Sequence, residues 1–405
     1  MTYFLVLISL AAILAAVCVT VEFAARAAIR RSAYYVFPPG LRLRMRPDPE
    51  TFPQLERATR FDVNTVGERG RELPVSDNLY RVLVAGGSQP EGFLLDQDTT
   101  WPGALQCLLD APERRRELGA THVHVGSIAR SGVGSEALEL IFKRVLPRYP
   151  RLQLIIIMVG ATDVLRWLEQ GAPEALRPVD IADVFRCHPE MTFGWTPLTL
   201  ATGELLRRAR RQWWRPLVVH DKTGRWIAKA RMMRAEATDV RTEVPDPSPM
   251  LKHFRHHFNR VIELAKANAD RVLVIRQPWF DGPFTSEEAA HMWHGAAGQV
   301  WREKVGAFYS FEVCSTLMHL LDAHAEVIAA AHDIEQVDLM PWLDRSLTTY
   351  YDGFHLTPAG ARAVAGSVAA ATLAQHAAAA MSRERIPATN LHAARVRARS
   401  FQTLP

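Results

Sequence analysis

Cysteine is scarce in this sequence. The 405 residues include four cysteines, at positions 18, 107, 187 and 314, and none of them forms a CxxC pair. This spacing indicates neither a disulfide framework nor a cysteine-based metal site. Charge of one sign is not in large excess either, since the formal net charge is +5. No nucleic-acid-binding motif accompanies the basic residues, so we expect no nucleic-acid partner.

The N-terminal stretch lacks charge altogether. Residues 1–21 contain no charged side chain and are strongly apolar, and about 20 such residues span a bilayer. A cleaved signal peptide usually has a basic start and a shorter apolar core. We therefore predict an uncleaved single-pass membrane anchor over residues 1–25. A signal peptide cut near Ala16 or Ala25 is the alternative.

Three arginines, Arg26, Arg30 and Arg31, follow the predicted anchor. Basic flanks tend to stay on the cytoplasmic side of a membrane. Taken literally, this tendency places the rest of the chain in the cytoplasm. The rule is statistical, and the side of the membrane is left open.

The remaining chain divides by composition. Residues 26–78 are rich in Pro, Arg and polar side chains and are interpreted as a lead-in to the domain. The domain itself extends over 79–380, with an insert of about 170–250 that lacks a clear periodicity. Residues 381–405 are basic and polar without an apolar face, which predicts a disordered tail.

Short apolar runs alternate with helical patterns through the domain. We predict strands at 82–85, 122–125, 152–159, 271–275 and 335–339. Helices are predicted near 101–109, 136–146, 252–267, 317–331 and 358–380. Strands followed by helices form βα units, and these predict an α/β fold with a parallel sheet.

Candidate chemistry begins where the first of these strands ends. The strand stops at Gly86 and Gly87, and Ser88 follows directly, where a nucleophile would stand at the carboxyl end of a central strand. Near the other end of the domain, Asp352 and His355 stand three residues apart just before a helix. One helix-like turn would bring the two side chains together. A carboxylate that orients an imidazole next to a serine suits acyl transfer.

Four sequence blocks in this order are similar to those of the SGNH (GDSL-type) hydrolases. They are Gly86-Gly87-Ser88, Ser131-Gly132, Gly160-Ala161-Thr162-Asp163 and Asp352-Gly353-Phe354-His355-Leu356-Thr357. The first three each follow a predicted strand, and the similarity covers roughly residues 60–380. The G-x-S-x-G elbow of the α/β-hydrolases is absent.

This resemblance implies a three-layer α/β/α fold with a parallel sheet of about five strands. It implies that Ser88 is the nucleophile, His355 the general base and then acid, and Asp352 its orienting carboxylate. The oxyanion hole would consist of the Ser88 N–H, the Gly132 N–H and the side chain at position 162.

Position 162 departs from the family pattern, because the family has asparagine where this chain has Thr162. Loss of one oxyanion donor typically costs on the order of 100- to 1000-fold in turnover. Either the threonine hydroxyl donates, or a group from the insert replaces it, or the enzyme is slow or inactive. We interpret the neighbouring Asp163 as structural.

Together these features predict a membrane-anchored serine esterase. It would cleave a small acyl ester, such as an O-acetyl group on a glycan or a lipid ester, through an acyl-enzyme and without a cofactor or metal. An O-acyltransferase on the same fold is one alternative. A catalytically weak domain that binds glycans or partners is the other.

Several other residues could have a functional role, but a structural role or exposure to solvent is the simpler interpretation. His253 and His257 form an i, i+4 pair that suits a metal, yet no third ligand is evident, so a packed or solvated helix face is favoured. Glu91 and Asp96 follow the serine and are interpreted as solvated. The basic segment 205–215 is interpreted as a solvated helix, with a membrane-surface segment as the alternative.

Overall fold

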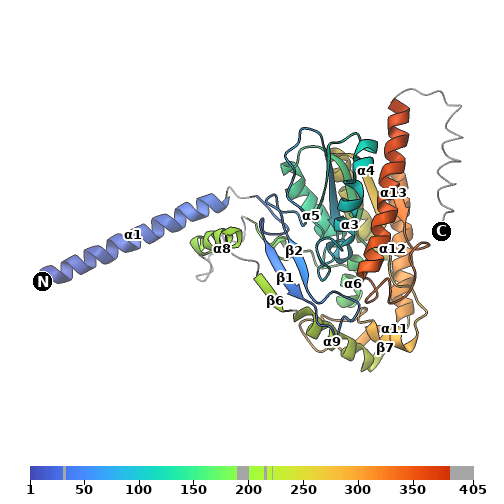
Figure 1. The fold of residues 1–405 in the computed structure, drawn as a ribbon. Coiled ribbons are helices and arrows are strands. Elements are labelled where there is room, and N and C mark those ends of the chain that lie inside the picture. The colour runs from blue at the N-terminus through green and yellow to red at the C-terminus, as the bar shows by residue number, and fades with distance from the viewer. Residues whose placement is uncertain (31–32, 189–199, 214–216, 221, 384–405) are drawn as a thin grey trace.

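A five-stranded parallel sheet forms the centre of the molecule (Figure 1). The computed structural model describes residues 1–30, 33–188, 200–213, 217–220 and 222–383. In spatial order the strands are β10 (Glu335–Asp338), β8 (Ala269–Arg276), β5 (Leu152–Met158), β3 (Leu79–Gly86) and β4 (His122–Ser127). The predicted strands and their parallel arrangement are confirmed. The predicted tail lies mostly outside the described residues.

Helices cover both faces of this sheet. One layer consists of α3 (Trp101–Leu109), α4 (Pro112–Glu117) and α13 (Pro358–Arg383), which contact one another. The opposite layer consists of α5 (Ser135–Val145), α6 (Ala161–Glu169), α10 (Ser248–Asn268) and α12 (Phe311–Ala331). A short 3₁₀ turn, η1 (Leu146–Arg148), follows α5. The three-layer α/β/α prediction is therefore confirmed.

Local signals account for where these helices begin. The Thr100 hydroxyl accepts a hydrogen bond from the Gly103 N–H (3.1 Å), and Pro102 occupies the first turn of α3. The Thr357 hydroxyl accepts from the Gly360 N–H (3.2 Å) at the start of α13. Both starts agree with the sequence prediction.

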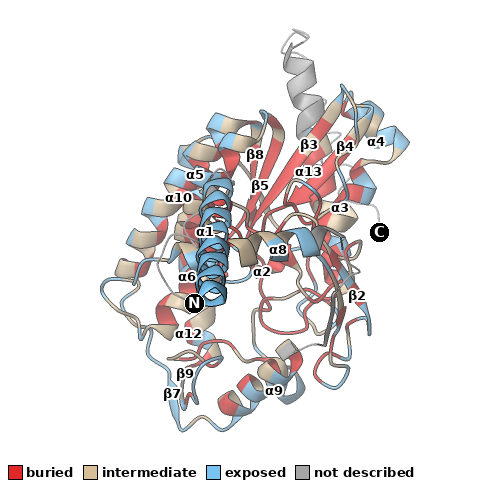
Figure 2. Cartoon of the chain, turned by 90° about the vertical axis from the view of Figure 1, so that its left-hand side faces the viewer, coloured by how far each residue is buried: buried red, intermediate tan, exposed pale blue. Residues whose placement is uncertain are grey.

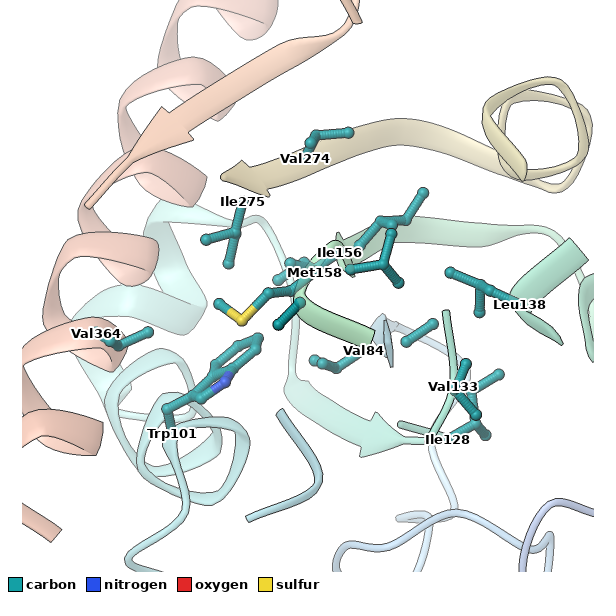
Figure 3. Packing of buried hydrophobic residues seen from close by; sticks show 14 of the residues in the cluster. Val84, Trp101, Ile128, Val133, Leu138, Ile156, Met158, Val274, Ile275 and Val364 are labelled. Atoms are coloured by element: carbon teal, nitrogen blue, oxygen red, sulfur yellow. The ribbon is translucent and has the colours of Figure 1, made fainter. Parts of the chain in front are cut away.

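The core lies between the sheet and the two helix layers. Figure 3 shows Trp101 of α3 and Val364 of α13 near Met158, and Leu138 of α5 near Ile156. All five side chains are almost completely buried. Apolar burial on both faces explains why the central strands are nearly continuous apolar runs.

Smaller elements come from the lead-in and from the insert. A three-stranded sheet joins β1 (Arg42–Arg46) to β2 (Thr59–Asp62) and β6 (Leu217–His220), and β7 (Asp239–Arg241) pairs with β9 (Ala307–Tyr309). Short or peripheral helices are α2 (Ser88–Glu91), α7 (Ile181–Val184), α8 (Ala201–Trp213), α9 (Lys222–Ala235) and α11 (Ser286–His291). The described parts of the insert thus include helices and strands.

The N-terminal helix α1 (Thr2–Arg30) projects away from the rest of the chain (Figure 1). It is exposed along almost its whole length, whereas the central strands are buried (Figure 2). Among the described residues it is the one helix long and apolar enough to cross a membrane. A signal sequence has the same properties, so length and composition fit a membrane anchor and a leader equally.

Candidate active site

Three loops meet at the carboxyl edge of the central sheet. β3 lies between β4 and β5 and runs parallel to both. The loop after β3 carries Ser88, the loop after β4 carries Gly132, and the turn after β5 carries Thr162. Parallel strands place their carboxyl ends together, so the first three sequence blocks are brought to one edge.

Glycine is required where β3 turns into α2, the short helix that begins at Ser88. Gly86 has φ +154°, and an added Cβ would lie 1.9 Å from the Met158 carbonyl oxygen. At Gly87 an added Cβ would lie 3.2 Å from the Val133 carbonyl oxygen and 3.6 Å from the Thr162 Oγ1. The close approach of these loops thus leaves little room for a side chain at position 87.

Ser88, His355 and Asp352 form a continuous chain of hydrogen bonds. The Ser88 Oγ lies 2.8 Å from the His355 Nε2, and the His355 Nδ1 lies 2.8 Å from the Asp352 Oδ2. Because a carboxylate only accepts, Nδ1 carries the proton and Nε2 of the neutral ring accepts from the serine hydroxyl. The serine is thereby next to a base that can take its proton.

The Asp352 carboxylate is fully buried and accepts hydrogen bonds from several N–H groups. The backbone N–H groups of Phe354 and His355 each donate to Oδ1 at 2.9 Å. The Trp293 Nε1 donates to Oδ2 at 2.9 Å. Sequence reasoning missed Trp293, because nothing near that residue in the chain signals a partner 59 positions away.

Asp352 and His355 each stabilise the charged form of the other. Burial by itself would raise the pKa of Asp352, but the adjacent His355 and the N–H donors hold it well below its usual value. Burial opposes a charged His355, yet the Asp352 carboxylate and, more weakly, Glu91 raise the pKa of His355 above its usual 6.5. An imidazolium formed during proton transfer would therefore be stabilised.

The predicted oxyanion donors lie around Ser88. The Ser88 N–H belongs to the first turn of α2, whose amides have no partner inside the helix. Gly132 is exposed and has φ +80°, a conformation that favours glycine. Thr162 lies in the first turn of α6, across from Gly87.

Glu91 is not a solvated surface residue, and that interpretation was wrong. Its side chain is buried and accepts hydrogen bonds from the Ser131 N–H (2.7 Å) and the Ser131 hydroxyl. Burial raises the pKa of the Glu91 carboxyl, although Ser131 and the nearby Arg69 counteract this. Glu91 therefore fixes the loop that carries Gly132. Asp96 instead pairs with Arg60 (2.6 Å).

Gln89 connects the two halves of the site. Its Nε2 donates to the Phe354 carbonyl (2.5 Å) and to the Pro278 carbonyl (3.0 Å). The first contact joins α2, which begins at Ser88, to the loop that carries His355. The second joins it to the segment after β8.

A small apolar cavity lies beside the loop of Asp352 and His355, with Gly353 in its lining. It measures about 40 Å³, and its lining includes His294, Met292, Phe354, Phe311 and Met318. Burial lowers the pKa of His294 to about 3, so its ring is neutral. This histidine was also missed by sequence reasoning, since it contacts the site only through the fold.

In two groups of side chains the possible metal-ligand atoms lie within 4.8 Å of one another. They are His294 with Asp352 and His355, and Glu136 with His253 and His257. In the first, the carboxylate and one imidazole already bond to each other. In the second, His257 pairs with Glu139 (2.6 Å), and Glu136 also bonds to Arg166 (3.0 Å). Glu136 also lies 3.4 Å from His253, so His253 and His257 each have a structural partner on α5.

Asp163 has a structural contact as well. Its carboxylate is buried and accepts from the Ser135 hydroxyl (2.6 Å) and the Ser135 N–H (3.0 Å). It joins the turn after β5 to the start of α5. This contact agrees with a role in shaping the loop.

No family model and no curated protein matches the chain. Among solved structures, the chain is similar to an acetylxylan esterase from Geobacillus stearothermophilus, at 11% identity and a TM-score of 0.37, over 72% of this chain and 93% of the other. It is also similar to a member of the lipolytic G-D-S-L family from Veillonella parvula, at 9% identity and a TM-score of 0.37, over 72% of this chain and 96% of the other. The function proposed below therefore rests on the site itself.

Proposed function

We propose that this protein is a serine hydrolase that cleaves a small acyl ester through an acyl-enzyme. The observation that carries the proposal is the continuous Ser88–His355–Asp352 hydrogen-bond chain, with both contacts at 2.8 Å. A module that only binds ligands has no need of such a chain. Its direction, from hydroxyl to imidazole to buried carboxylate, is the one that activates a serine.

The reaction would proceed in two halves. The Ser88 Oγ attacks the ester carbonyl carbon while the His355 Nε2 takes the hydroxyl proton. The negative oxygen that forms is held by the oxyanion donors, and His355 then returns the proton to the leaving alcohol. A water molecule attacks the acyl-serine with the same base, which releases the acid and regenerates Ser88.

We infer that the acyl group enters the small cavity beside Phe354, the residue that precedes His355. At about 40 Å³ this cavity is far smaller than the cavity of roughly 150 Å³ that accommodates benzene. An O-acetyl group on a glycan and a short lipid ester would both present such a group. We therefore expect activity to fall along a series from p-nitrophenyl acetate to butyrate to octanoate.

The test uses the full chain in detergent or nanodiscs. A fluorophosphonate probe should label the wild type, and p-nitrophenyl acetate should give a burst of nitrophenol. Ser88→Ala should lose both signals, whereas Ser286→Ala, which alters an exposed serine on α11, should keep them. Equal labelling of the wild type and Ser88→Ala, or no labelling of a folded wild type, would reject the proposal.

A further inference from the structure

The N-terminus of α8 is held by a carboxylate from α1. The Glu22 side chain accepts hydrogen bonds from the backbone N–H of Ala201 (2.8 Å), the backbone N–H of Thr202 (3.2 Å) and the Thr202 hydroxyl (3.0 Å). The first amides of a helix have no internal partners, and a negative charge there is favourable. Glu22 thus serves as an N-terminal cap supplied by another helix.

Apolar contacts complete this joint. Ala25 and Ile29 of α1 are buried against Ala201 of α8, and Leu205 packs on the same cluster. In Figure 1, α8 lies beside the carboxyl-terminal end of α1. Among the described elements other than α1, α8 extends farthest toward the N-terminal end of α1 in Figure 1. The position of α8 along α1 is therefore fixed.

This position has a consequence if α1 spans a bilayer. At 1.5 Å per residue, the uncharged residues 1–21 measure about 30 Å, which is the thickness of the hydrocarbon core. Glu22 and the turns after it then lie among the headgroups. Since α8 is joined to these turns, it lies at the same depth.

The exposed face of α8 carries side chains that suit the headgroup region of a bilayer. Leu206 is 71% exposed, and the Arg207 side chain is 63% exposed. Arg210 is exposed one turn further along. Arg207 and Arg208 both contact Glu204, at 3.4 and 3.1 Å, which leaves an excess of positive charge on the helix. Helices that lie in a membrane interface combine a polar face rich in Arg and Lys with apolar residues such as Leu.

We propose that α8 docks on anionic lipid headgroups of the same membrane that α1 anchors. Its arginines would bind lipid phosphates and carboxylates while Leu206 enters the boundary. The α/β domain would then keep a fixed orientation against the bilayer, because two helices and not one would attach it to the membrane. The joint also favours an uncleaved α1, because cleavage near Ala25 would remove the Glu22 cap.

The test places the full chain in nanodiscs. An environment-sensitive fluorophore is attached to Leu206→Cys in a Cys18→Ala, Cys107→Ser background, since both of those cysteines are exposed. Discs of phosphatidylcholine are compared with an equimolar mixture of phosphatidylcholine and phosphatidylserine. Phosphatidylserine should shift the emission to the blue and protect the label from acrylamide, a neutral quencher.

The triple variant Arg207→Gln, Arg208→Gln, Arg210→Gln should lose this protection. Each arginine near an anionic surface changes the ratio of docked to undocked protein roughly fivefold, and added salt should act in the same direction.

The matched control changes three arginines of α4, Arg114, Arg115 and Arg116, to Gln, far from α1 in Figure 1, and should keep the protection. Equal quenching in both kinds of disc would overturn the proposal. So would protection that survives the triple change on α8, or a label that responds to added DNA duplex and not to phosphatidylserine.

Discussion

The Trp293 Nε1 donates to the Asp352 Oδ2 at 2.9 Å, so an indole from the segment before β9 holds the carboxylate that faces His355. The other N–H donors to this carboxylate come from its own loop. Among the described residues, Trp293 therefore supplies the one hydrogen bond to Asp352 that comes from a distant part of the chain. It is a positioning residue, because it acts through Asp352.

Trp293→Phe should lower kcat and leave KM nearly unchanged. The phenyl ring keeps most of the packing but cannot donate, and a hydrogen bond to a charged group contributes about 1.5–3 kcal/mol. We expect a loss of roughly tenfold to hundredfold in turnover of p-nitrophenyl acetate. Trp301→Phe, at a half-exposed tryptophan, is the control. An unchanged kcat in Trp293→Phe would show that Asp352 is held by its own loop alone.

Glu91→Gln should move the pH profile. His355 acts as a base only when neutral, so activity rises with pH through its pKa, which lies above 6.5. The Glu91 charge contributes to raising that pKa, and its removal should shift the rising limb of kcat/KM to lower pH. The amide can still accept from Ser131, which limits the loss at the plateau. Glu117→Gln, on exposed α4, should leave the profile in place, and a shift to higher pH in Glu91→Gln would contradict this account.

Thr162→Val and Thr162→Asn test the third oxyanion donor. Valine has the shape of threonine without its hydroxyl, so acylation should slow by about 100- to 1000-fold if the hydroxyl donates. Asparagine supplies a longer N–H donor and should equal or exceed the wild type. Single-turnover acylation measures both. A Thr162→Val variant that acylates at the wild-type rate would exclude the hydroxyl from the oxyanion hole.

Glu68→Ala should lower the free energy of unfolding, although Glu68 is not one of the predicted site residues. The fully buried Glu68 carboxylate contacts Arg81 (2.8 Å) and His124 (2.7 Å). Removing one partner of a buried ion pair typically costs about 3–5 kcal/mol. Denaturant unfolding at neutral pH should show this loss, whereas Glu117→Ala should show little.

The same carboxylate should make the wild type sensitive to acid. Burial would raise the pKa of Glu68, but His124 and Arg81 hold it at about 2, below the ordinary value of 4.5. Its stabilisation is therefore complete above pH 4.5 and is lost as the pH falls toward 2. Unfolding free energies measured across that window should fall more steeply in the wild type than in Glu68→Ala.

Much of the fold was predictable, because its signals are local. The central strands are apolar runs bounded by turns, and helix starts such as Thr357-Pro358 follow directly from capping chemistry. Ser88, Asp352 and His355 were predicted as partners, and the fold brings them together. Their catalytic roles remain a prediction until the nucleophile is tested.

The rest depends on contacts between distant segments. Glu91 was interpreted as solvated, yet its carboxylate is buried and bonds to Ser131, 40 positions away. Trp293 and His294 belong to a stretch with no recognisable motif, and only the packing of that stretch on Asp352 gives them a role. The Glu22 cap on α8 spans 179 positions, which no periodicity reveals.

The two hydrogen bonds of Gln89 bear on the long stretch of chain between the third sequence block, at 160–163, and the last block, at 352–357. One side chain in α2 contacts the segment after β8 and the loop of His355. This side chain therefore couples the position of Ser88 to that of His355 across the intervening polypeptide. Changes in that polypeptide are compatible with the site only where they keep the Pro278 and Phe354 carbonyls and the Trp293 N–H in place.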